Sequence, residues 1–140
     1  MENYITEKNK WLWLFIIALC IACTSNNEKS IPQDIIAKST GYTVRKYKRY
    51  LYPEVCILKN ELTREAKMVN IDGMEVNLID EKAVKSTEIS TIEFYKFMQI
   101  ENGNTEIELV LMPRRQYIRF RFKKSGNETW DSTTITPWQD

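Results

Sequence analysis

One uninterrupted apolar run near the start of the chain constrains everything that follows it. Residues 11–23, WLWLFIIALCIAC, contain no charged side chain. As a helix this run would be about 20 Å long at about 1.5 Å per residue. The apolar core of a bilayer is about 30 Å thick and needs about 20 such residues. Because polar residues border the run on both sides, it is too short for an ordinary membrane span.

The flanks of the run are typical of a secretory signal peptide. Lys8 and Lys10 form a small basic head before it, and a polar tract, TSNNEKS, follows it at residues 24–30. A basic head, a short apolar run and a polar tract, in this order, are the layout of an export signal. An uncleaved anchor and a buried core helix remain alternatives, because a core helix of this length is equally apolar.

The end of the run, CIAC at residues 20–23, resembles the lipobox of bacterial lipoproteins, in which a small residue precedes a cysteine. The resemblance covers residues 1–23 only. It implies that Cys23 is diacylated and that Ala22 is the last residue removed with the signal peptide. Two acyl chains would anchor the protein stably, whereas one chain binds only marginally. Because Thr24 stands where Asp often marks inner-membrane retention, the resemblance favours the outer membrane, facing the periplasm.

The run also divides the chain into parts. The expected parts are a signal peptide (1–22), a lipidated tether (23–30) and one globular domain (31–140); an ordinary cleaved signal would release the same domain without lipid. Removing residues 1–22 leaves 118 of the 140 residues, enough for a domain with its own core. Hydrophobic residues at 43% and aromatic residues at 11% argue against disorder, and a net charge of +1 argues against a general polyanion binder.

The residue types that most catalytic sites need are scarce. The chain has no histidine, the usual general base and the commonest metal ligand. Two of its three cysteines lie in the signal, and Cys56 lies in the apolar run VCIL, where we expect a small buried side chain. The carboxylate pairs, Asp80 with Glu81 and Glu106 with Glu108, are expected to form solvated faces. We therefore predict no catalytic residue, no metal and no cofactor.

After the tether, the residue pattern favours strands over helices. A short helix is expected over about residues 32–39, with Gly41 as the left-handed residue after its end. Asp72-Gly73 between two apolar segments is the strongest hairpin signal in the chain. Residues 60–68 stay ambiguous between a helical turn and a strand. The expected strands are residues 42–52, 54–58, 68–71, 74–79, 89–100, 105–112, 117–123 and 128–135.

These elements predict a mainly β fold behind one short N-terminal helix. The sheet is expected to be an antiparallel meander, arranged as a curled sheet, a small sandwich or a small barrel, with an α+β fold as the alternative. One hairpin register follows from a loop at residues 113–116, because a slip by one residue would set apolar side chains against charges. The predicted pairs are Leu111–Ile118, Leu109–Phe120, Ile107–Phe122, Val110–Arg119, Glu108–Arg121 and Glu106–Lys123.

Two segments, residues 45–52 and 114–124, interleave basic and aromatic side chains. Such segments bind phosphates and stack bases in some proteins. An exported lipoprotein rarely meets nucleic acid, so we expect most of these cations to pair with carboxylates across the sheet. Binding to a lipid headgroup or another anionic surface is the alternative. Arg114 and Arg115 differ, because they lie in a turn and have no assigned carboxylate. These two residues are the candidates for contact with a partner, and the alternative is that they only keep the turn soluble.

The expected function is that of a small membrane-anchored envelope lipoprotein with a non-enzymatic domain, which binds a protein or assists envelope assembly. An immunity lipoprotein that neutralises a toxin acting in the periplasm is one alternative. A small-ligand carrier is another, if the sheet closes into a barrel with a cavity. The predicted partners are the membrane, through the lipid on Cys23, and a protein; nucleic acid and metal are not expected.

Overall fold

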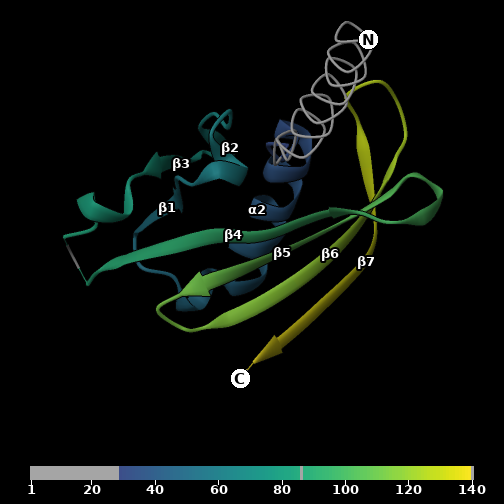
Figure 1. Ribbon diagram of the computed structural model, residues 1–140. Coiled ribbons are helices and arrows are strands. Elements are labelled where there is room, and N and C mark those ends of the chain that lie inside the picture. The colour runs from purple at the N-terminus through teal and green to yellow at the C-terminus, as the bar shows by residue number, and fades with distance from the viewer. Residues whose placement is uncertain (1–28, 86, 140) are drawn as a thin grey trace, which may run out of the picture.

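The computed structural model describes residues 29–85 and 87–139, which form one long helix packed against a seven-stranded sheet (Figure 1). Short 3-10 turns (η) lie between several of these elements. In chain order the elements are α2 (Gln33–Tyr47), η1 (Lys48–Tyr50), β1 (Glu54–Leu58), η2 (Glu61–Thr63), β2 (Val69–Ile71), β3 (Met74–Ile79), η3 (Glu81–Ala83), β4 (Ile89–Gln99), η4 (Glu101–Gly103), β5 (Asn104–Met112), β6 (Gln116–Lys124) and β7 (Trp130–Gln139).

The sheet is mixed and open. Its strands follow the order β2-β3-β1-β4-β5-β6-β7. Strands β4 to β7 form the predicted antiparallel meander, whereas β1 runs parallel to both β3 and β4. The sheet curls around α2, which lies against one of its faces (Figure 1). The predicted mainly β fold, with a curled sheet behind one N-terminal helix, is therefore confirmed, and the sheet formed by the described residues does not close into a barrel.

The helix is longer than predicted. It spans 15 residues and ends at Tyr47, so the strand predicted over residues 42–52 is wrong. The β-branched and aromatic residues of this segment favour strands locally. However, Ile36, Thr40 and Val44 follow one another at intervals of four and are all buried. Burial of one continuous helix face therefore outweighs the local strand preference.

Gly41 lies in the middle of α2, not after its end. At this point the helix crosses β2 closely, because a Cβ atom on Gly41 would lie 3.3 Å from Ile71 Cδ1 and 3.3 Å from Arg45 Nη1. A residue without a side chain permits this approach. The glycine thus marks a contact between helix and sheet, and the prediction that it ends the helix is wrong.

Two local features in the first half of the chain are the turn between β2 and β3 and the segment 60–68. Asp72 and Gly73, with φ of 53° and 87°, form the turn between β2 and β3, which confirms the predicted hairpin. The ambiguous segment 60–68 begins with η2. Asn60 caps this turn, since its Oδ1 accepts hydrogen bonds from the backbone nitrogens of Leu62 at 3.0 Å and Thr63 at 3.2 Å.

The β5–β6 hairpin has the predicted faces in a different register. Its loop is residues 112–115, not 113–116, because Leu111 pairs with Gln116 and Arg115 adopts a left-handed φ of 55°. The resulting shift is two residues, which leaves every side chain on its own face, so the alternation of apolar and charged residues cannot distinguish the two registers. The observed pairs include Leu109–Ile118, Ile107–Phe120, Thr105–Phe122, Val110–Tyr117, Glu108–Arg119 and Glu106–Arg121.

The core lies between α2 and the face of the sheet that it covers. Cys56 is buried at 3% exposure, as predicted. The largest fully buried side chains are Phe94, Phe120, Phe122, Ile35, Ile36, Ile57, Ile92, Ile107, Leu109, Leu111, Ile118 and Val55.

Within residues 29–85 and 87–139, no helix has the length and apolar character needed to cross a membrane.

Candidate functional site

The β5–β6 loop meets η1 at the C-terminal end of α2. The guanidinium carbon of Arg114 lies 3.6 Å from the centre of the Tyr50 ring. We call Arg49, Tyr50, Arg114 and Arg115 the cationic tip. Because Ser30 lies just before the start of α2, it and the tip are at opposite ends of the helix (Figure 1).

The side chains of the cationic tip are exposed, and none of its arginines pairs with a carboxylate of the described residues. Tyr50 is 60% exposed, the largest value among the exposed large hydrophobic residues. Within the part of the chain that the structure describes, no Asp or Glu lies within ion-pair distance of Arg49, Arg114 or Arg115. The stack on Tyr50 contributes about 0.5–1 kcal/mol at such an exposed site and holds the Arg114 side chain in place.

The arginines within β6 are placed quite differently. On the sheet face that α2 does not cover, Arg121 Nε lies 3.0 Å from Glu106 Oε2. Arg119 Nη2 lies 2.7 Å from Glu108 Oε1, and Lys96 Nζ of β4 lies 3.1 Å from the same oxygen. These five residues form an ion-pair cluster across three strands, so Arg119 and Arg121 are structural, as predicted, although their partners follow the corrected register.

The two carboxylates of the cluster are buried, which contradicts the expected solvated face. Glu106 and Glu108 are 5% and 6% exposed, because the cations of the neighbouring strands lie over them. Burial by itself would raise the pKa of the Glu108 carboxyl, but hydrogen bonds from Arg119, Lys96 and Tyr95 hold that pKa below its usual value. The partners of Glu108 thus favour its anionic form, which makes it a poor candidate for proton transfer.

A small groove adjoins the cationic tip. Its volume is about 250 Å³, below the range of about 300–1,000 Å³ typical of small-molecule pockets. Arg114 lies at its rim, and the hydroxyl oxygen of Ser90 is occupied by a hydrogen bond from the Tyr52 nitrogen at 2.9 Å. We call this cavity the tip groove. It is lined by Tyr50, Leu51, Tyr52, Ser90, Leu111, Met112, Pro113 and Arg114.

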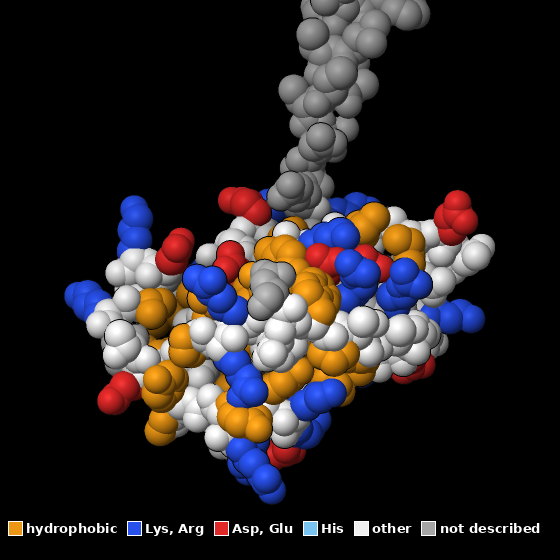
Figure 2. All heavy atoms as spheres, turned by 90° about the horizontal axis from the view of Figure 1, so that it is seen from below, with side chains coloured by type: hydrophobic (Ala, Val, Ile, Leu, Met, Phe, Trp, Pro, Cys, Tyr) orange, Lys and Arg blue, Asp and Glu red, His pale blue; other side chains and the backbone are white. Residues whose placement is uncertain are grey.

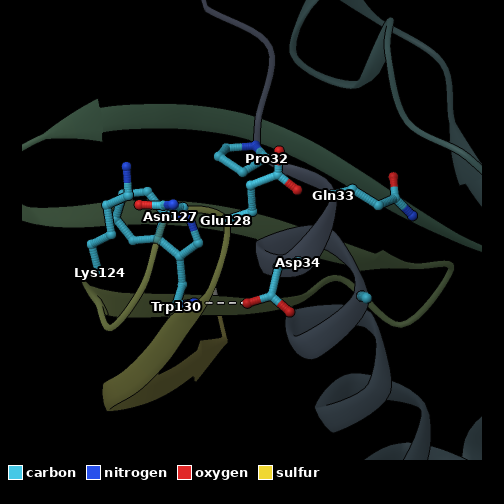
Figure 3. Close-up of a pocket in the computed structure, with 8 residues that line it drawn as sticks. Pro32, Gln33, Asp34, Lys124, Asn127, Glu128 and Trp130 are labelled. Atoms are coloured by element: carbon cyan, nitrogen blue, oxygen red, sulfur yellow. Dashed lines mark hydrogen bonds between the residues drawn. The ribbon is translucent and has the colours of Figure 1, made fainter.

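A larger cavity, of about 660 Å³, lies between the first turn of α2 and the β6–β7 connection (Figure 3). Two of the polar groups on its wall, Asp34 and the Trp130 nitrogen, are engaged with each other. The Trp130 nitrogen donates a hydrogen bond of 2.8 Å to Asp34 Oδ2, and Lys38 Nζ lies 3.0 Å from the same oxygen. Lys124 lies 5.7 Å from the centre of the Trp130 ring. These contacts join α2 to β7 beside the cavity, so Asp34 has a structural role here.

The structure brings together some of the predicted site residues and adds others. Arg114 and Arg115 lie side by side in the loop, as predicted. Tyr50 belongs to the same site but falls in a segment predicted to be a strand, although its place directly after Lys48 and Arg49 is a usable signal. Cys23 and Ala22 lie outside the described residues. Basic and apolar side chains are interspersed over the face shown in Figure 2, so charge alone would not have singled out the tip.

No group of three or more Cys, Asp or Glu side chains among residues 29–85 and 87–139 is arranged to hold a metal ion.

Comparison of the chain with known protein families, with curated proteins and with solved structures found no match. The assignment of a function therefore rests on the geometry of the cationic tip and on the signal-like N-terminal sequence.

Proposed function

We propose that the chain is a small envelope lipoprotein, anchored in a membrane by a lipid on Cys23, whose domain works by binding a protein partner and not by catalysis. The observation that carries the binding role is the cationic tip. Two arginines that pair with no carboxylate of the described residues stand on a loop between two nine-residue strands, and an exposed aromatic ring orients one of them. Arginine and tyrosine are enriched among the residues that dominate binding energies.

The position of the tip supports the same proposal. The helix α2, 15 residues long, spans about 22 Å at about 1.5 Å per residue. A lipid anchor that precedes Ser30 would attach to the end of the helix opposite the tip, which would then be presented away from the anchoring membrane. In the proposed outer-membrane location, this places the tip in the periplasm, where a protein partner reaches it.

Lipidation is tested by metabolic labelling. Cells that express the wild-type chain or the Cys23→Ala variant are grown with a clickable fatty acid, and the purified proteins are compared by fluorescence in gels. The wild type should be labelled and Cys23→Ala should not, whereas Cys56→Ala, a matched control, should keep the label. Equal labelling of wild type and Cys23→Ala would refute the lipid anchor at this residue.

Partner binding is tested by crosslinking in cells followed by affinity purification. The double variant Arg114→Glu with Arg115→Glu should lose the partner that the wild type retains. Lys123→Glu with Lys124→Glu is the matched control, because it makes the same change of charge at the opposite end of β6. Recovery of the same partner by all three proteins would show that the tip is not the binding surface.

A further inference from the structure

The tip groove and the cationic tip together suggest a chemical class of partner. This inference rests on the proposed binding role of the tip. The groove is apolar over most of its wall, since Leu51, Leu111, Met112 and Pro113 all contribute to it. Its volume of about 250 Å³ suits one or two inserted side chains better than a whole small molecule.

The charge at the mouth of the groove is positive. Arg114 lines the groove itself, and Arg115, which is also exposed, follows it in the loop. Arg49, which directly precedes Tyr50 in η1, is a further exposed cation. Glu54 begins β1 and Glu88 directly precedes β4, but neither lines the groove. A ligand that enters the groove therefore meets guanidinium groups before it meets a carboxylate.

The arginine side chain at the groove is already oriented for binding. Its guanidinium is stacked on Tyr50, so less rotamer freedom is lost when it binds an anion. A guanidinium binds a carboxylate through two parallel hydrogen bonds, and the loop supplies two adjacent arginines for this purpose. A partner segment with carboxylates beside one large apolar side chain would satisfy both the arginines and the groove.

We propose that the tip groove binds an acidic peptide segment of a protein, with one apolar side chain inserted between Tyr50 and Pro113 and neighbouring carboxylates on Arg114 and Arg115. An anionic bilayer is the competing ligand for a cluster of arginines. The geometry favours the peptide, because the tip lies at the opposite end of α2 from the tether and the groove accommodates side chains.

The test uses the full-length protein in nanodiscs of phosphatidylcholine. Random peptides displayed on phage are selected against the wild-type protein, with empty nanodiscs as the background. Selected peptides should carry two or more Asp or Glu residues next to a large apolar residue. Failure to enrich any peptide above background, or enrichment of peptides without acidic residues, would overturn the proposal.

Affinity of the selected peptides, measured by fluorescence anisotropy, then locates the site. Arg114→Glu with Arg115→Glu should weaken binding more than about tenfold. Arg114→Lys, which keeps the charge and loses the planar stack on Tyr50, should weaken it by a smaller factor, and Lys123→Glu with Lys124→Glu should bind as the wild type does. An equal loss in this control and in the tip variant would overturn the assignment of the site.

A parallel measurement separates the peptide from the membrane. Vesicles of phosphatidylcholine with added phosphatidylglycerol are mixed with the nanodisc-held protein, and binding is measured by flotation. Binding that requires Arg114 and Arg115, without any peptide enrichment, would assign the tip to an anionic bilayer and refute the peptide. If crosslinking still retrieves a protein through the tip while selection yields no acidic peptide, only the ligand chemistry proposed in this subsection fails.

Discussion

At the scale of single residues, the most informative side chains are the two buried glutamates of the ion-pair cluster. A carboxylate that loses contact with water is destabilised unless charged donors replace the water. Glu106 and Glu108 each have two or more such donors within 3.5 Å, from Lys96, Arg119 and Arg121. Their burial therefore stabilises the meander only while the carboxylates stay ionised.

We expect Glu108→Gln to lower the free energy of unfolding at neutral pH by about 1–3 kcal/mol, because charged hydrogen bonds are replaced by neutral ones. The pKa of Glu108 is lowered in the folded state, so its contribution is complete above the ordinary glutamate pKa of about 4.3 and is lost as pH falls through the folded value. Urea denaturation from pH 7 to pH 3 should show the two proteins converging in acid. A difference that grows on acidification would contradict this account.

A second single-residue feature is the hydroxyl group of Thr40. It is fully buried on α2 and has no hydrogen-bond partner among the described residues. Thr43, also fully buried on the same helix, donates a hydrogen bond of 2.8 Å to the carbonyl oxygen of Ser39. The two threonines are thus equally buried on one helix and differ in whether the hydroxyl group makes a hydrogen bond, so they can be compared directly.

Thr40→Val should raise the free energy of unfolding by about 1 kcal/mol, because the replacement has nearly the same shape and removes a buried polar group without a partner. Thr43→Val is the control and should bring no gain, since it removes a hydrogen bond that is made. Both values come from chemical denaturation. A loss of stability in Thr40→Val would indicate that its hydroxyl group has a partner.

At the scale of elements, the β5–β6 hairpin has two kinds of arginine with two different roles. Those within β6 cover buried carboxylates, and those in the loop project from the end of the hairpin. Because both strands are nine residues long and pair along most of their length, the loop is held rigidly relative to the sheet. The ion-pair cluster thereby supports the loop without contacting a partner itself.

Arg121→Glu should lower the free energy of unfolding by about 1–3 kcal/mol, because it sets a second carboxylate beside the buried Glu106 across the strands. Arg115→Glu should change it by less than about 0.5 kcal/mol, since Arg115 is exposed and has no carboxylate partner in the described residues. Thermal and urea denaturation measure both. Equal destabilisation by the two variants would mean that the loop arginine is also structural.

At the scale of the whole molecule, α2 connects the two edges of the curled sheet. Near its start Asp34 accepts a hydrogen bond from the Trp130 nitrogen of β7, and near its end Arg45 Nε lies 2.9 Å from Asp72 Oδ2 in the β2–β3 turn. Between them the helix buries Ile36 and Val44 against the sheet. The helix thus contacts both edges of the sheet and fills its curved face.

We expect a fragment from about residue 28 onward to fold alone as a β-rich monomer, because the buried core of the described residues lies within residues 31–130. Far-ultraviolet circular dichroism should show strand as the main component with a contribution from one helix, and size-exclusion chromatography with light scattering should give the monomer mass. A spectrum dominated by helix, or a fragment that does not fold, would contradict this expectation.

Several features of this molecule follow from the sequence alone. The alternation along residues 105–112 and 117–123 determines which side chains face the core, because successive side chains of a strand point to opposite faces. Asp72-Gly73 determines a tight hairpin, since both residues tolerate positive φ. The charges around residues 114 and 115 are likewise local, so the exposed loop arginines could be predicted without knowledge of their neighbours.

Only the tertiary structure decided the remaining features, because each depends on residues far apart in the chain. The second half of α2 is helical since its buried face packs on β2 and β6, against the local strand preference of Thr43 and Val44. The partner of each β6 arginine depends on a two-residue shift that the alternation of strands cannot detect. Arg114 meets Tyr50 only because the end of the helix and the hairpin loop lie together in the folded chain.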